Sequence, residues 1–252
     1  MTQDYAYICT MDTKAFESPF FSRQTRRLRL VMALGVGLMA SACQNPGDWM
    51  EEERALIEEQ PSVMRVLTVE DAQDLKVLRT QCRDFSARAL KDPLYDELVG
   101  KMLATVTSPE QDGVGIAGPQ VGISRRIVAV QRFDKEGEPF EVYPNVRILE
   151  HLGDTVRGPE GCLSIPGKRG IVPRSEGVIV RWTDPQTLQA VTDTIHGFTA
   201  IIFQHETDHL DGVLYTDRAE SVFDNPEWEA ERAPYAAEGA YDKPRWLRGG
   251  EY

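Results

Sequence analysis

The chain has few cysteines, few histidines and no excess of basic residues, and these shortages limit the kinds of protein and of metal site that it can form. Its 252 residues include four cysteines, too far apart for a disulfide framework or a paired-cysteine zinc ribbon: Cys9, Cys43, Cys82 and Cys162. Acidic residues outnumber basic ones by 40 to 28, a net charge of −12, so a positive surface that coats nucleic acid is not expected. Only four histidines are available for a metal site. The 41% hydrophobic content is typical of a soluble globular protein.

The first 42 residues differ in charge from the rest, with five basic and three acidic residues. A basic cluster leads into residues 30–42, an uncharged stretch that spans only about 20 Å as a helix, too short to cross a bilayer. This pattern is typical of a secretory signal. The Ala-Ser-Ala-Cys ending resembles a bacterial lipoprotein box, in which Cys43 would carry the lipid anchor. A misassigned start, with Met64 as the first residue, is the alternative.

Four segments follow from composition and periodicity. We expect a signal-like segment at 1–42, a solvated acidic tether at 43–62, a catalytic domain at 63–220 and an acidic extension at 221–252, with a helix at 226–239. Apolar spacing predicts helices at 93–107 and 198–210, the second closed by Gly212. Short β-rich runs predict strands at 127–130, 141–143, 178–182 and 190–195. The order helix, strands, helix indicates an α+β fold.

The segment Gln204-His205-Glu206-Thr207-Asp208-His209 is the sharpest signal for chemistry. His205 and His209 lie one helical turn apart, so both imidazoles can reach one metal ion. Glu206 is placed to take a proton from a water at that ion. The alternative is an ordinary amphipathic helix with polar residues at the surface. The apolar run 201–203 favours a buried helix, where such residues need partners.

A third metal ligand must come from elsewhere in the chain. No histidine follows His209, which disfavours a zinc peptidase of the kind that takes a ligand downstream. Cys162, in the segment Glu160–Ser164, is the candidate, although a lone cysteine is often only a small buried side chain. A glycine-rich segment at 113–120 lacks the Lys-Ser/Thr of a nucleotide loop. Its glycines let the backbone approach a ligand, and Gln120 can donate a hydrogen bond.

These three segments, 113–120, 160–164 and 204–212, occur in the order and form that resemble the peptide deformylase family. The resemblance covers about residues 63–220. It implies an α+β fold in which mixed and antiparallel β-sheets pack around a central helix that carries the His-Glu-x-x-His sequence. Gly118 departs from the family pattern, which usually has alanine there, and we expect a looser loop.

The resemblance also implies an activity. The enzyme would remove the formyl group from the N-terminal formylmethionine of peptides or newly made proteins and release formate. One Fe²⁺ would be held by Cys162, His205 and His209, and Zn²⁺, Ni²⁺ or Co²⁺ could substitute. Glu206 would act as the general base. Gln120 and the backbone N–H of Leu163 would donate hydrogen bonds to the oxyanion.

Substrate binding is expected to occur by strand addition, with N-formylmethionyl peptides or nascent chains as partners. The backbone would pair with the peptide at four residues: Gly115, Ile116, Glu160 and Gly161. Phe198, Ile201 and Ile202 would line the methionine pocket, with plain core packing as their alternative role. Arg169 would contact the peptide beyond methionine or form a surface salt bridge.

The remaining expectations concern location and assembly. The chain is expected to be a monomer that does not bind nucleic acid and touches a membrane only through Cys43. It would face the periplasm if the signal is real, and otherwise it would be cytoplasmic, as is usual for the family. An envelope-anchored deformylase-like protein that binds peptides without turnover is an alternative, and a zinc peptidase is another.

Overall fold

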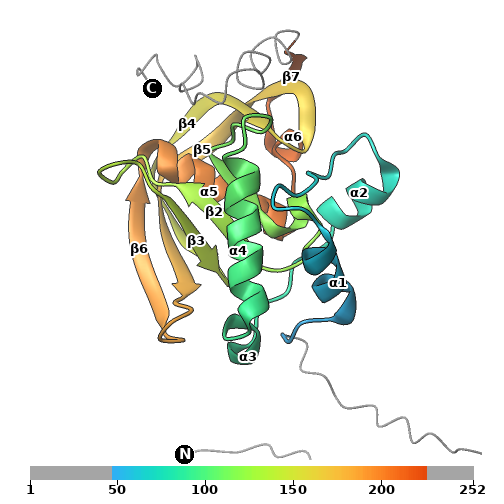
Figure 1. The fold of residues 1–252 in the computed structure, drawn as a ribbon. Coiled ribbons are helices and arrows are strands. Elements are labelled where there is room, and N and C mark those ends of the chain that lie inside the picture. The colour runs from blue at the N-terminus through green and yellow to red at the C-terminus, as the bar shows by residue number, and fades with distance from the viewer. Residues whose placement is uncertain (1–46, 226–252) are drawn as a thin grey trace, which may run out of the picture. The chain divides into compact units, whose positions relative to one another are not determined.

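The computed structural model describes residues 47–225 (Figure 1). The helices and strands in this part of the chain are α1 (Glu51–Glu59), α2 (Ala72–Leu78), α3 (Ala87–Leu90), α4 (Pro93–Val106), β1 (Gly115–Ala117), the 3₁₀ helix η1 (Gly118–Val121), β2 (Ile127–Gln131), β3 (Phe140–Pro144), β4 (Arg147–Cys162), β5 (Ile165–Thr183), β6 (Ala190–His196), α5 (Gly197–Leu210), α6 (Tyr215–Arg218) and β7 (Ser221–Asp224).

The strands form two antiparallel sheets. One has the order β1-β2-β3, and the other has the order β4-β5-β6, with β7 paired to the first part of β5. Helix α5 contacts β1 and β2 of the first sheet and β5 and β6 of the second, and it lies in the middle of the view in Figure 1. This arrangement confirms the predicted α+β class, with a central helix that carries both histidines of the motif.

Helix α4 coincides with the helix predicted at 93–107. The Asp92 side chain accepts a hydrogen bond from the backbone N–H of Leu94 at 3.0 Å, and Pro93 occupies the first turn, two features that favour a helix start. Leu98 and Met102 are fully buried on the side that faces the core. The predicted helix is therefore confirmed by its capping and by its buried stripe.

The predicted strands agree with β2, β3 and β6 to within one residue at each end, and the run at 178–182 lies inside β5. The long strand β4 was not expected. Most side chains in its middle, from Glu150 to Thr155, are exposed, so the strand has no apolar alternation for a sequence pattern to reveal. Its pairing with β5 over most of its length defines it instead.

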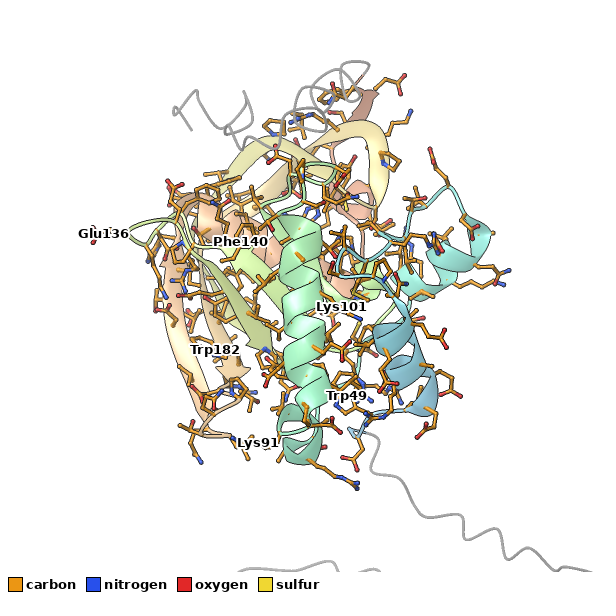
Figure 2. The ribbon with its side chains drawn as sticks, viewed as in Figure 1. Trp49, Lys91, Lys101, Glu136, Phe140 and Trp182 are labelled. Atoms are coloured by element: carbon orange, nitrogen blue, oxygen red, sulfur yellow. The ribbon has the colours of Figure 1, made fainter. Side chains whose placement is uncertain are left out.

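The segment predicted to be a solvated tether is part of the fold in its described portion. Ile57 of α1 is fully buried, and Trp49 packs edge-on against Phe85 at a ring-centroid distance of 5.2 Å. Figure 2 shows Trp49 on the side of α4 that faces α1, with Lys101 further along that helix. Lys101 Nζ donates to the carbonyl of Gln60 at 2.9 Å, which satisfies an acceptor just past the end of α1.

A buried ion pair explains why this acidic helix packs rather than extends. Arg125 is fully buried, and its Nε and Nη2 donate to the Glu53 carboxylate at 2.7 and 2.6 Å. Its guanidinium also lies over the rings of Trp49 and Phe85, 5.7 and 5.6 Å from their centroids. A buried arginine requires such a partner, so the expectation of a tether was wrong for residues 49–59.

At the other end of the domain, β7 continues the fold a few residues past the predicted boundary at 220. The predicted signal segment, Cys43 and the helix at 226–239 lie outside the described residues. Within 47–225, no helix is long and apolar enough to cross a membrane.

Candidate metal and catalytic site

Helix α5 and the end of β4 bring three possible metal ligands together. His205 and His209 project from one face of α5, and Cys162 is the last residue of β4. One ligand atom from each of the three lies within 4.8 Å of the other two, and Cys162 Sγ is 3.3 Å from His209 Nε2. All three side chains are at least nine-tenths buried. The structure therefore brings together the set that the sequence predicted.

The chemistry of this set fits a single divalent ion. A tetrahedral ion with metal–sulfur and metal–nitrogen bonds of about 2.3 and 2.1 Å has ligand atoms about 3.4–3.6 Å apart. The separation between Cys162 and His209 is close to that range. Three protein ligands leave one position for water or substrate, which is the arrangement of catalytic rather than structural sites.

The orientation of His205 is fixed from behind by Glu160. Glu160 Oε2 lies 2.8 Å from His205 Nδ1. Burial works against ionisation of Glu160, but the hydrogen bonds from Arg174 and His205 lower its pKa to about 2. An ionised carboxylate only accepts, so Nδ1 carries the proton and Nε2 is left for the metal. Burial disfavours charge on His205, yet the Cys162 sulfur and the Glu160 carboxylate raise its pKa well above the ordinary value.

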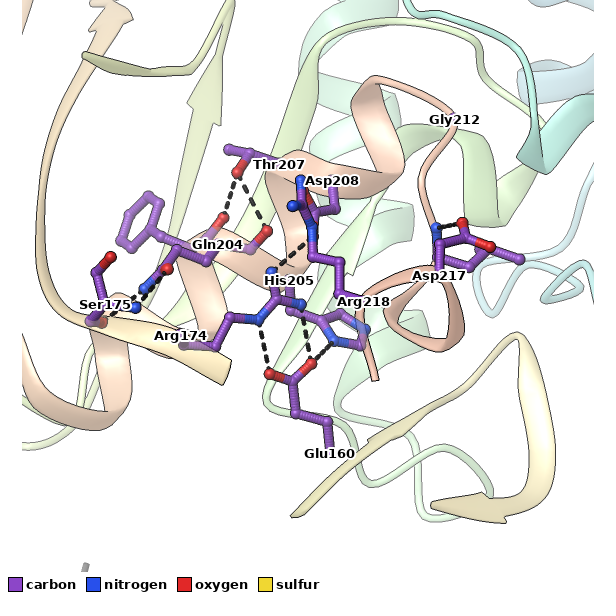
Figure 3. A network of polar contacts seen from close by, with 12 residues as sticks. Glu160, Arg174, Ser175, Gln204, His205, Thr207, Asp208, Gly212, Asp217 and Arg218 are labelled. Atoms are coloured by element: carbon purple, nitrogen blue, oxygen red, sulfur yellow. Dashed lines mark hydrogen bonds and ion pairs between the residues drawn. The ribbon is translucent and has the colours of Figure 1, made fainter. Parts of the chain in front are cut away.

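Arg174 links this pair to the far side of α5, as Figure 3 shows. Its Nε and Nη2 donate to Glu160 at 2.7 and 3.0 Å, and its Nη1 donates to Asp208 at 2.6 Å. Asp208 also accepts from Arg218 of α6 at 2.6 and 2.7 Å. The chain His205–Glu160–Arg174–Asp208–Arg218 therefore joins α5, β4, β5 and α6 in one network that is buried except at Arg218.

Glu206 is the buried carboxylate beside the ligands. Burial raises its pKa to about 7, and Oε2 has no hydrogen-bond partner among the described residues. Its other oxygen lies against the backbone of Gly115: a Cβ built on that glycine would be 2.5 Å from Oε1. A carboxylate with a pKa near neutrality can both take and return a proton.

His209 differs electrostatically from His205 although both face the same point. Burial and the nearby charge of His205 hold the pKa of His209 well below its ordinary value. Its Nδ1 is buried without a partner among residues 47–225. A neutral imidazole is the form that binds a metal ion, so His209 is ready to bind, whereas His205 would give up its Nε2 proton on binding.

Gln120 and Leu163 complete the polar side of the site. Gln120 Oε1 accepts from the backbone N–H of Ala117 at 2.8 Å, which fixes the amide so that Nε2 faces Cys162 Sγ at 3.6 Å and Ser164 Oγ at 3.3 Å. Leu163 lies in the tight turn between β4 and β5, next to Cys162. Both predicted oxyanion donors are thus adjacent to the ligand set.

The predicted substrate residues fall into two groups. Gly115 and Ile116 lie on β1, whose only strand partner among the described residues is β2, and Glu160 and Gly161 lie where β4 reaches the site. Gly161 sits at a register shift and is exposed, whereas the Glu160 side chain is occupied by His205 and Arg174.

The other residues predicted to contact the substrate differ in burial and in what they pack against. Ile202 is buried, and its Cγ2 would be 2.8 Å from a Cβ on Gly115, so it borders the site. Ile201 is half-buried. Phe198 packs on Phe133 at 5.2 Å between ring centroids, which is core packing. Arg169 is half-buried on β5, opposite Phe223 of β7.

Sequence reasoning missed the contribution of α6. The Tyr215 ring stacks on His205, with 6.0 Å between centroids and an interplanar angle of 21°, and its hydroxyl is buried without a partner among the described residues. Arg174 and Arg218 were likewise not assigned. The motif itself offered a signal only for Asp208, because the partners of these side chains lie on other helices and strands.

Gly118 does not loosen its loop, contrary to expectation. A Cβ at this position would lie 2.7 Å from the Ile123 carbonyl oxygen and 2.8 Å from that of Arg125. The neighbouring backbone has closed around the missing methyl group, so the loop is tightly packed.

An α+β fold with a Cys-His-His set, a buried glutamate and an amide donor has the features of a single-metal hydrolase. The family model for polypeptide deformylase matches residues 63–224. A peptide deformylase of Roseiflexus sp. (strain RS-1) is 33% identical over 189 residues, which covers 70% of this chain and 100% of that protein. Peptide deformylase 2 of Nostoc sp. (strain PCC 7120) is 43% identical over 139 residues, which covers 52% of this chain and 75% of that protein.

Solved structures agree with these relatives. The Met-Ala-Ser-bound class I type b peptide deformylase of Acinetobacter baumannii is 36% identical with a TM-score of 0.55, and the match covers 62% of this chain and 98% of that one. The peptide deformylase of Thermotoga maritima is 31% identical with the same TM-score, over 63% and 99% of the two chains. The chain belongs to the peptide deformylase family, and the predicted enzyme identity is confirmed.

Proposed function

We propose that the chain removes the formyl group from the N-terminal formylmethionine of peptides or newly made proteins and releases formate. The observation that carries this proposal is the convergence of Cys162, His205 and His209 beside a buried Glu206 in a member of the deformylase family. The ligand set fits one divalent ion. We expect Fe²⁺, with Zn²⁺, Ni²⁺ or Co²⁺ able to substitute.

The ion, when bound, supplies a Lewis acid that lowers the pKa of water and polarises the formyl carbonyl. Glu206 takes the proton of the attacking water, because burial raises its pKa to about 7, which suits it to act as a base near neutrality. The same carboxylate then passes the proton to the departing amine, and its burial beside Gly115 keeps it in place between the two steps.

The oxyanion that forms on the formyl oxygen is stabilised by two donors on this chain. Gln120 Nε2 is aimed at the site by the bond between Oε1 and Ala117, so it needs no reorganisation during the reaction. The Leu163 backbone N–H is the second donor, on the turn that follows Cys162. Loss of one such donor costs about 3 kcal/mol of barrier.

The substrate peptide binds as an added strand. The free edge of β1 at Gly115 and Ile116, and the end of β4 at Glu160 and Gly161, border the ligand set, and both can pair with an extended backbone. Ile202 and the half-buried Ile201 line the methionine pocket, Phe198 supports it from the core, and Arg169 contacts residues beyond methionine.

The chain acts as a monomer in this proposal, because all the groups named for the reaction come from a single chain. Its location depends on residues 1–43. Metabolic labelling with radioactive palmitate tests the lipoprotein prediction: label on the chain that Cys43→Ser abolishes supports a lipid anchor, whereas an unlabelled chain in the cytoplasmic fraction supports the usual location of the family.

The activity is tested with the full chain, loaded anaerobically with Fe²⁺ and given formyl-Met-Ala-Ser. Cys162→Ser is expected to lose both metal and formate release. Cys82→Ser is the matched control, since Cys82 is also buried but lies outside the ligand set, and burial raises the pKa of its thiol to about 12. A chain that holds one metal ion yet releases no formate would instead support the peptide-binding alternative.

A further inference from the structure

A cavity lies on the face of α5 that points away from the candidate metal ligands. It has a volume of about 710 Å³ and is bordered by Gln204, Thr207 and Asp208 of that helix and by Asp211, which follows its last residue. These positions recur every three to four residues, so they form one face, while His205, Glu206 and His209 project elsewhere. None of the residues that carry the proposed reaction lines this cavity.

The lining is unusually basic for an acidic chain. Four arginines contribute to it: Arg126, Arg147, Arg174 and Arg218. The carboxylates in the lining are Asp208 and Asp211, and His151 is its only histidine. With His151 neutral, the lining has an excess of two positive charges, in a protein whose net charge is −12.

Both carboxylates are already paired within the cavity wall. Asp211 Oδ1 accepts from Arg126 Nη1 at 2.5 Å, and Asp208 accepts from Arg174 and Arg218 at 2.6 Å each, as Figure 3 shows for Asp208. Arg147 pairs with Asp84, which is not part of the lining, at 2.9 Å. Each carboxylate in the lining is therefore paired with an arginine, and no unpaired carboxylate of the lining would repel an incoming anion.

Two guanidinium nitrogens in the cavity wall carry N–H groups that donate to no acceptor in the described part of the chain. The Arg126 side chain is only 6% exposed; its Nε donates to the Val146 carbonyl and its Nη1 to Asp211, but no acceptor within 47–225 takes a bond from Nη2. Because Arg126 lines the cavity, this nitrogen is the donor that the side chain can offer to a ligand there. In Arg218, Nε and Nη2 both donate to Asp208, and Nη1 has no acceptor in the described chain.

Both arginines line the same cavity, so their remaining donors can serve one ligand there. Arg126 and Arg218 are held by Asp211 and Asp208, which are three residues apart at the C-terminal end of α5. Guanidinium groups match the oxygens of phosphate in geometry and charge. The cavity is larger than a phosphate ion and lies in the size range of small-molecule sites.

We propose that this cavity binds a small phosphate-bearing molecule, with its phosphate held between Arg126 and Arg218. The body of the molecule occupies the remaining space toward Arg147 and His151. The cavity is distinct from the site of the proposed deformylation, although Arg174 and Asp208 in its wall belong to the network that supports His205.

Titration of the metal-loaded full chain with inorganic phosphate, at constant ionic strength and followed by calorimetry, tests the site. We expect a dissociation constant of about 1 mM or tighter. Arg218→Gln and Arg126→Gln should each weaken binding by about tenfold. The Arg218 side chain is half-exposed, so its replacement leaves no cavity in the core. Arg157→Gln is the matched control, because that exposed arginine pairs with Glu220 outside the cavity, and it should leave binding unchanged.

Other outcomes contradict the proposal. Binding that survives both cavity substitutions but disappears when the metal is removed would place the anion at the metal instead. If no binding is detected at a phosphate concentration about tenfold above the expected dissociation constant, the proposed site is wrong. Formate as a second probe separates the anion classes: tighter binding of formate than of phosphate would contradict the phosphate assignment, and tighter binding of a sugar phosphate than of inorganic phosphate would support an organic ligand.

Discussion

Glu160 Oε2 lies 2.8 Å from His205 Nδ1, and both oxygens of the same carboxylate accept from Arg174. This contact makes a residue of the Glu-Gly-Cys segment part of the support for a histidine of α5. The carboxylate fixes both the tautomer and the ring orientation of His205, so the geometry of the candidate ligand set depends on Glu160, which is not a member of that set.

Glu160→Gln should therefore weaken metal binding by about 10- to 100-fold, because the amide lacks the charge that stabilises the protonated Nδ1 and the Arg174 guanidinium. Competition with a metal-sensitive dye measures the change. Glu220→Gln serves as the control, since Glu220 pairs with Arg157 at the surface. Equal affinities in the two variants would show that Glu160 does not support His205.

Gly115→Ala should lower kcat by about 100-fold with little change in metal content, because its Cβ would push the Glu206 carboxylate from its position. Gly100→Ala in α4 is a matched change, since a Cβ there meets nothing within 4 Å. That control should keep full activity and gain about 0.5–1 kcal/mol of stability. Unchanged turnover in Gly115→Ala would mean that the carboxylate position tolerates such a shift.

Glu53→Gln should lower the free energy of unfolding by about 3 kcal/mol, because the fully buried Arg125 keeps its charge while losing the Glu53 carboxylate that pairs with it. Urea denaturation of the full chain measures the loss. Glu59→Gln, an exposed change in the same helix, should remain within about 0.5 kcal/mol. Identical midpoints for the two variants would indicate that α1 contributes nothing through this pair.

The stability of the α2 region should depend on acid pH through Asp74. Its side chain is 6% exposed and accepts from Arg65 at 2.7 and 2.6 Å, which lowers the pKa of the carboxyl. A lowered folded-state pKa contributes stability that is complete above the unfolded value of about 3.9 and is lost as pH falls through the folded value.

Asp74→Asn should accordingly destabilise the chain by about 1–2 kcal/mol at pH 7, and the difference from the unchanged protein should shrink below about pH 4. Denaturant midpoints between pH 3 and 7 provide the test. Glu70→Gln, at an exposed position nearby, should show no such trend. A difference that stays constant down to pH 3 would contradict the role of the Asp74 charge.

Local patterns in the sequence were sufficient for the histidine pair and for helices α4 and α5, whereas Cys162 became a candidate only because a third ligand was missing. The one-turn spacing of His205 and His209 is a property of a single helix. Asp92, Pro93 and an apolar stripe mark α4 within its own segment of the sequence. The burial of α1 could not be predicted in this way, because it depends on Arg125, a residue far along the chain that needs a carboxylate when buried. The same holds for Tyr215 against His205, a contact made by packing alone.

The central claim is that Glu206 acts as the base for deformylation at a metal held by its neighbours. Formate release and metal content, measured on the same preparations of the full chain and of Glu206→Gln, test it most directly. We expect one metal ion per chain in both, with formate release from formyl-Met-Ala-Ser reduced by about a thousandfold in the variant. A metal-loaded Glu206→Gln that releases formate at an unchanged rate would contradict the account.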